Sequence, residues 1–157
     1  QVFVRAVCTA TLGACEGALQ AFIEVAKTRQ VGPNKMSNDP YARQLAAEVR
    51  ASIEEMKLTM VRNFDAMMES CRSGEAIPVD SRVRYRYDSA VVADRCLELS
   101  SRMLKASGSG GIRKGSELLD FHLDMLASQA HVANNSVPFA NNMGGMMFGE
   151  ENLDYAV

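Results

Sequence analysis

Hydrophobic residues recur at helical spacing along most of the chain, in long segments separated by short breaks that contain glycine or proline. Asp39 and Pro40 mark the start of the second segment, because aspartate caps helices and proline fits the first helical position. No stretch alternates long enough to predict a strand. The predicted helices cover about residues 2–29, 38–72, 80–106 and 117–133. This pattern predicts an all-α fold, an up-down-up-down four-helix bundle.

The second segment carries a narrow apolar stripe, close to the spacing of a coiled coil. Its members are Leu45, Val49, Ile53, Met56, Met60, Phe64, Met67 and Cys71. The tail from Asn134 is too rich in glycine for a stable lone helix and too apolar for disorder, so we expect it to pack on a partner subunit or another domain. These apolar surfaces exceed what one bundle can bury, which predicts a homo-oligomer, a tetramer built from two-fold pairs.

The length of 157 residues suits a single helical domain, residues 1–157. The helical pattern already runs at Val2 with no methionine before it, so we interpret the chain as a fragment of a longer protein. Lys and Arg number 17 against 19 Asp and Glu, and this balance argues against a nucleic-acid partner. The basic run at residues 82–87 is interpreted as the first turns of a helix with a solvated face.

The four cysteines, Cys8, Cys15, Cys71 and Cys96, show no close pairing. Metal sites need ligands at short, repeated spacing, so no metal site is predicted. The cysteines are interpreted as small core residues in a reducing compartment. No segment is judged apolar enough to cross a membrane, and no signal peptide is visible. A cytoplasmic protein without a membrane partner is therefore expected.

A glycine-dense, basic stretch separates the third and fourth segments. Glycine allows a close approach to a ligand, and the following helix start with basic side chains suits a phosphate. The candidate cofactor-binding residues are Ser107, Gly108, Gly110, Gly111, Arg113, Lys114 and Ser116. His131 follows on the next apolar helical run and is the candidate for proton transfer. The alternatives are a plain connection between helices and a structural histidine.

The chain resembles the C-terminal helical domain of the acyl-CoA dehydrogenase fold. The similarity is carried by residues 12–19, 39–40, 45–48 and, most specifically, 106–131. It is closest to the type 2 domain of two-component, reduced-flavin-dependent monooxygenases, such as the oxygenase component of p-hydroxyphenylacetate hydroxylase. Ser107, Gly108, Ile112, Asp124 and His131 fall on family positions.

The resemblance implies an oxygenase that hydroxylates a small, aromatic substrate through a flavin C4a-hydroperoxide. Reduced FMN or FAD would be the cofactor, delivered by a separate flavin reductase. His131 would lie beside the flavin ring as the catalytic residue. Arg29 matches, more faintly, an arginine turn that reaches a neighbouring subunit's flavin, although a helix C-terminal cap would explain it equally well.

Several positions depart from the family pattern. Ser116 and Glu117 replace an Asn-Pro pair, and Leu123 and Leu126 replace an arginine and a histidine. Val132 occupies the position of the glutamate that abstracts the substrate proton in many dehydrogenases, which argues against dehydrogenation by that route. The alternatives left open are an N-oxygenase of an amine or amino sugar, an acyl-CoA dehydrogenase-like protein, and a flavin-free helical oligomerisation domain.

Overall fold

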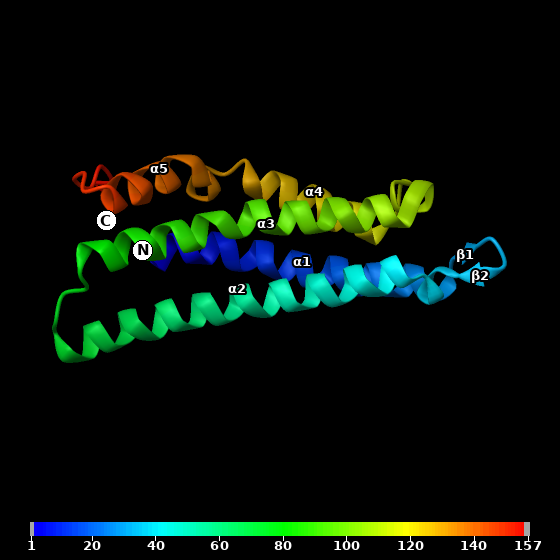
Figure 1. Cartoon of the computed structure of the whole chain (residues 1–157), viewed down its shortest axis with the longest axis horizontal. Helices are drawn as coiled ribbons and strands as arrows, with labels where there is room; N and C mark the ends of the chain where they lie inside the picture. Colours follow the sequence, from blue (N-terminus) through cyan, green and yellow to red (C-terminus); the bar gives the residue numbers. More distant parts are fainter. Residues whose placement is uncertain (1, 156–157) are drawn as a thin grey trace.

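The central element of the fold is α1 (Val2–Thr28), which contacts α2, α3 and α4 along its length. The computed structural model describes the backbone of residues 2–155 and the side chains of residues 6–155. The remaining elements are β1 (Gln30–Val31), β2 (Asn34–Lys35), η1 (Met36–Asn38), α2 (Pro40–Ser73), α3 (Val79–Gly111), α4 (Glu117–Gln129), η2 (Val132–Asn134) and α5 (Ser136–Met147). Four helices run alternately up and down, and α5 continues beside α3 (Figure 1). The predicted helical bundle is confirmed.

The apolar character of α1 comes from its central place in the bundle. Cys8, Cys15, Leu19 and Phe22 are all buried on it. The segment Ala6–Thr28 is long and apolar enough to cross a membrane by length and composition, so the expectation that no segment meets this test was wrong. A core helix of a water-exposed bundle passes the same test, because it needs apolar residues on several faces.

Helix α2 starts and ends as its sequence predicts. The Asp39 side chain accepts a hydrogen bond of 2.9 Å from the Tyr41 backbone N–H, and Pro40 takes the first helical position. Gly74 ends the helix in the left-handed conformation, with φ 73°. These two signals are local, and local chemistry is what a sequence reports most directly.

The apolar stripe of α2 is buried only over its first part. Beyond Met56 the buried face continues through Asn63 and Met67, while Phe64 and Cys71 are exposed. Asn63 is held there by a 2.8 Å hydrogen bond from its Nδ2 to Asp88 on α3. The prediction of a core position was wrong for Cys71. The exposure of Phe64 agrees with the expectation that the apolar stripe exceeds what one bundle can bury.

Two helix ends and the tail differ from the prediction. Helix α3 continues to Gly111, α4 ends at Gln129, and the tail forms the additional helix α5. A short antiparallel hairpin pairs β1 with β2, although no strand was expected. The tail is ordered by its own chain, because α5 packs on α3 and the Asn142 side chain accepts a 2.7 Å hydrogen bond from the Leu153 N–H. Contact with a partner subunit stays a prediction.

Gly17 lets α4 approach α1 closely. A Cβ placed there would lie 2.4 Å from Cζ of Phe121 on α4, whereas a Cβ at Gly13, one turn away, meets nothing within 4 Å. We expect Gly17→Ala to destabilise the fold by about 1–3 kcal/mol, as is usual for overpacking. Gly13→Ala should instead be neutral or stabilising by up to about 1 kcal/mol. Denaturant titration followed by circular dichroism compares the two, and equal stabilities would show that Phe121 moves aside freely.

Candidate functional site

The glycine-dense stretch is the C-terminal end of α3 rather than a long loop. Residues 107–111 stay within the helix, except that Gly108 has φ 56° and ψ −154°, a conformation open only to glycine. Ser107 is fully buried and Gly111 lies against its side chain. The predicted loop from 106 to 116 was therefore too long. The connection to α4 begins at Ile112 and holds Arg113, Lys114, Gly115 and Ser116.

Arg29 lies against the kink at Gly108. A Cβ at Gly108 would be 2.8 Å from Nη2 of Arg29, and a Cβ at Gly110 would be 3.7 Å from Nη1. Nη1 of Arg29 and Oγ of Ser107 are both buried, and neither has a hydrogen-bond partner within residues 6–155. Unsatisfied buried polar atoms of this kind need an explanation, such as an ion, a water or a ligand. The structure thus brings Arg29, Ser107 and Gly108 together.

A pocket of about 410 Å³ opens beside this cluster. Its lining includes Gly110, Arg113, Lys114 and Ser116 from the connection, together with Thr28 from α1. Glu24 and Glu117 also line it, so its charge is mixed. Ser116 precedes α4, whose first N–H groups have no side-chain cap. Free N–H groups and two exposed cations in the pocket fit a phosphate group of a cofactor, while the unsatisfied Nη1 of Arg29 is buried behind Gly110 of the lining.

His131 lies at the opposite end of α4, outside the helix. It caps η2, with φ −72° and ψ 134°, and its Nδ1 accepts a 3.1 Å hydrogen bond from the Ala133 N–H. The 13 residues of α4 place it about 20 Å from the connection, at 1.5 Å of rise per residue. The expectation that His131 lies within the helix was wrong, because α4 ends at Gln129. The side chain is exposed.

The residues that hold the turn containing His131 were not indicated by any sequence motif. Arg86 was assigned to a solvated face, but only 8 % of it is exposed. Its Nη1 donates a 2.9 Å hydrogen bond to the Ala133 carbonyl, and burial lowers the pKa of its guanidinium. A signal was present, since Val83, Arg86 and Ala90 share one helix face and all three are buried. Basic neighbours obscured that signal.

The other histidine of the chain has a structural environment. His122 is half-buried between α4 and α3, and its Nδ1 lies 2.8 Å from Oγ of Ser100. Burial lowers the pKa of His122, so the neutral ring is favoured. Asp124 is exposed. Within residues 6–155, no three His, Cys, Asp or Glu side chains are grouped as metal ligands.

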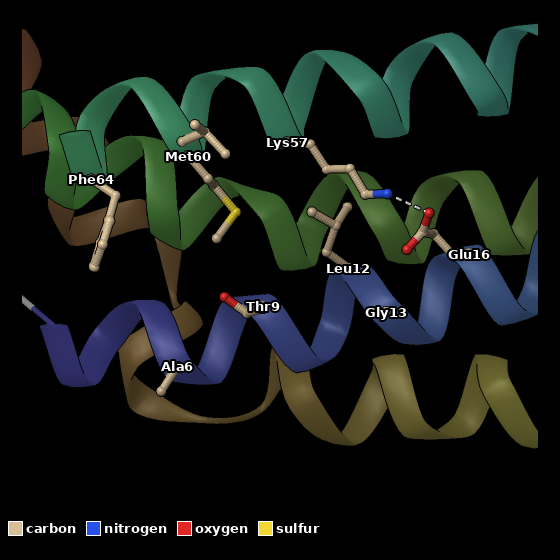
Figure 2. A pocket seen from close by; sticks show the side chains of 9 residues that line it. Ala6, Thr9, Leu12, Gly13, Glu16, Lys57, Met60 and Phe64 are labelled. Carbon is tan, nitrogen blue, oxygen red and sulfur yellow. Dashed lines mark hydrogen bonds and ion pairs between the residues drawn. The ribbon is translucent and has the colours of Figure 1, made fainter.

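A larger, apolar groove of about 570 Å³ lies between α1 and α2. Figure 2 shows Met60 and Phe64 of α2 above Ala6 and Thr9 of α1, with the ion pair of Lys57 and Glu16 at one end. Nζ of Lys57 is 2.5 Å from Oε1 of Glu16. The adjoining face of α2 exposes Leu58, Val61, Phe64 and Met68. Apart from the ion pair, the groove offers little chemistry, and its lining suits an apolar protein surface.

Comparison with known families gives a match over most of the chain. The family model described as the acyl-CoA dehydrogenase C-terminal domain matches residues 6–136. The chain is also similar to the oxygenase subunit HsaA of a flavin-dependent monooxygenase from Mycobacterium tuberculosis, with 25 % identity over 146 residues. That match covers 88 % of this chain and 37 % of the relative, so the chain spans little more than a third of the relative's length.

Two solved structures share the fold. The 3-HSA hydroxylase from Rhodococcus sp. RHA1 has a TM-score of 0.89 at 23 % identity, covering 99 % of this chain and 41 % of that one. XiaF from Streptomyces sp., solved in complex with FADH2 and glycerol, has a TM-score of 0.87 at 19 % identity, covering 96 % of this chain and 39 % of that one. The resemblance in fold that the sequence indicated is confirmed.

Proposed function

This chain belongs to the acyl-CoA dehydrogenase C-terminal domain family, and from that premise we propose that it is the C-terminal domain of a flavin-dependent monooxygenase. The enzyme is an oxygenase component that hydroxylates a small, aromatic substrate with reduced FMN or FAD, supplied by a separate reductase. The similarity to an oxygenase subunit over 88 % of the chain carries this proposal. A solved neighbour that holds FADH2 supports the choice of reduced flavin.

The residues of this chain have two roles in the proposal. Arg29, Arg113 and Lys114 bind the phosphate end of the cofactor at the connection between α3 and α4, as their charge and the unsatisfied Nη1 of Arg29 suggest. His131 is the catalytic residue. Because its Nδ1 accepts the Ala133 N–H, the neutral ring carries its proton on Nε2. Reduced flavin, when bound, supplies the reaction with oxygen, and His131 supplies a hydrogen-bond donor at Nε2.

The residue next to His131 separates this proposal from a dehydrogenase. Val132 is 79 % exposed at the tip of the same turn, beside His131. An aliphatic side chain cannot remove a proton, so the position that the resemblance gives to a catalytic glutamate holds no base. A donor without an adjacent carboxylate suits oxygen transfer better than α,β-dehydrogenation.

The proposal extends to the assembly. The basic connection and His131 lie about 20 Å apart along α4, so a complete site requires the rest of the polypeptide or a second copy. The exposed apolar face of α2 and the exposed Met147 and Phe148 of the tail support a homotetramer. We place the enzyme in the cytoplasm. Light scattering of the full-length protein tests the assembly, and a monomer at micromolar concentration would contradict it.

Anaerobic titration of the full-length protein with reduced FMN and reduced FAD tests the cofactor. We expect saturable binding of at least one reduced flavin, seen as a change in flavin fluorescence. The fluorescence change should be lost when inorganic pyrophosphate competes for the same cations. If the full-length protein binds neither reduced FMN nor reduced FAD, the oxygenase proposal is contradicted, and the flavin-free oligomerisation domain is the alternative that remains.

A further inference from the structure

The turn that carries His131 is held by more contacts than a simple helix connection needs. Asp94 of α3 clamps both sides of it, since Oδ1 accepts a 2.7 Å hydrogen bond from Gln129 and Oδ2 accepts one from Ser136. Nδ2 of the fully buried Asn134 donates to the Ser128 carbonyl at 2.9 Å. The turn is therefore fixed before and after His131, while His131 and Val132 remain exposed.

Arg86 holds the middle of this turn. Its guanidinium donates to the Ala133 carbonyl at 2.9 Å, and its Cζ lies 3.4 Å from the ring centroid of Phe139 on α5. The N–H of the same residue, Ala133, donates to Nδ1 of His131. One residue thus accepts from Arg86 on one side and orients His131 on the other.

Burying a cation between two helices has an unfavourable desolvation free energy. Removing a guanidinium from water is unfavourable unless hydrogen bonds, packing and a nearby carboxylate, here that of Asp154, offset the loss. An apolar side chain at position 86 could pack on Phe139 without that cost. An apolar side chain could not anchor the Ala133 carbonyl, which belongs to the peptide unit between Ala133 and Asn134, because that requires a hydrogen-bond donor.

We propose that Arg86 is a positioning residue that anchors the peptide unit between Ala133 and Asn134, whose N–H also donates to the His131 carbonyl at 2.8 Å. It thereby holds the turn in which the Ala133 N–H donates to Nδ1 of His131, with Nε2–H directed outward. The inference rests on the proposed function for its catalytic consequence, although the orientation of the ring is a property of this chain alone. Without Arg86 the turn loses the hydrogen bond that anchors the Ala133 carbonyl to α3. The Ala133 N–H then leaves Nδ1 part of the time, and the ring samples both tautomers and several rotamers. Donation from Nε2 is then lost part of the time.

The test compares Arg86→Leu with Arg102→Leu in the full-length enzyme. Arg102 is also on α3, but it pairs with Glu48 of α2, away from the turn. Nitrogen-15 NMR of labelled histidine reports the tautomer, and the His131 signal is identified by its loss in His131→Asn. We expect Arg86→Leu to convert a single Nε2–H tautomer into a mixture, and Arg102→Leu to leave it unchanged. An unchanged tautomer in Arg86→Leu would overturn the proposal.

Coupling is the second measurement. We expect Arg86→Leu to lower the ratio of hydroxylated product to hydrogen peroxide on the order of 10- to 100-fold, as misplacement of a reacting group does, with KM for the substrate unchanged. Arg86→Lys keeps a donor but lacks the planar fork, so its ratio of product to peroxide should lie between those of the parent and Arg86→Leu. If Arg86→Leu loses its helical circular dichroism, Arg86→Met, which keeps the length of the side chain without a donor, decides by the same two measurements. Parent-like values in Arg86→Met would then overturn the proposal.

The two proposals fail in distinguishable ways. If His131→Asn retains parental coupling, His131 is not the catalytic donor and the proposed function loses its residue, whatever Arg86 does to the ring. If His131→Asn uncouples the enzyme but Arg86→Leu changes neither tautomer nor coupling, the oxygenase proposal stands and the positioning role of Arg86 falls. A tautomer change with parental coupling would overturn the catalytic consequence claimed for Arg86.

Discussion

His131→Asn is expected to lower the yield of hydroxylated product on the order of 100-fold, in the range of a positioned proton-transfer group. Hydrogen peroxide release should rise as product falls. Asparagine keeps an acceptor near the place of Nδ1, so the hydrogen bond from the Ala133 N–H and the cap of η2 are retained. Only the Nε2–H donor is removed. Oxygen consumption, product and peroxide are measured together under single-turnover conditions.

His122→Asn is the matched control for this substitution. His122 also uses Nδ1 for a hydrogen bond, to Ser100, and it lies on α4 away from the turn. We expect its coupling to match the parent, while the melting temperature of both variants stays close to that of the parent. If His131→Asn and the parent have the same ratio of hydroxylated product to hydrogen peroxide, His131 has no role in the reaction. A large loss of stability in His131→Asn would instead indicate a structural histidine.

The double substitution Arg113→Ala with Lys114→Ala is expected to weaken binding of reduced flavin by about 1–3 kcal/mol, or roughly 5- to 150-fold. Both side chains are exposed and line the pocket at the start of α4, so the bundle itself should be unaffected. Because exposed charges are screened by salt, parental affinity should fall with ionic strength more steeply than that of the variant. Anaerobic fluorescence titration at two salt concentrations measures both effects.

A control of equal charge change is Arg72→Ala with Arg84→Ala. These exposed residues lie on the parts of α2 and α3 that adjoin their connection, at the end of the bundle opposite the pocket (Figure 1). Their removal should leave affinity for reduced flavin within about twofold of the parent, since charges farther apart than a Debye length interact weakly. Equal weakening by both pairs would mean that general electrostatic attraction, and not the pocket, accounts for binding.

The helices could be predicted because their signals are local. Asp39, Pro40 and the spacing of Leu45, Val49 and Ile53 each specify structure within a few residues. The bundle then follows, since long amphipathic helices joined by short connections pack antiparallel. Asn63 is a core residue that the pattern did not indicate. It is buried through a hydrogen bond to Asp88 of α3 that spacing along α2 could not reveal.

The candidate site was predicted in part, because its pieces are joined by tertiary contacts. Sequence reasoning named Arg29, Ser107 and Gly108, and the structure brings them together. The helical pattern also placed His131 on the last turns of the fourth helix, whereas α4 ends at Gln129 and His131 lies in a separate turn. Arg86 lies 45 positions before His131 and reaches its turn only after α3 packs on η2 and α5. Contacts of that kind leave no short-range motif.

The most direct measurement of the central claim is the source of oxygen in the product. The full-length protein would be given chemically reduced flavin, ¹⁸O₂ and a panel of phenolic substrates, with no reductase present. The account predicts that one ¹⁸O atom is incorporated into at least one phenol as a new hydroxyl group on the aromatic ring. It also predicts that His131→Asn abolishes most of this incorporation and raises the yield of labelled hydrogen peroxide. Oxygen consumed entirely as hydrogen peroxide by the parent protein, with every phenol and with amine substrates as well, would contradict the assignment as an oxygenase.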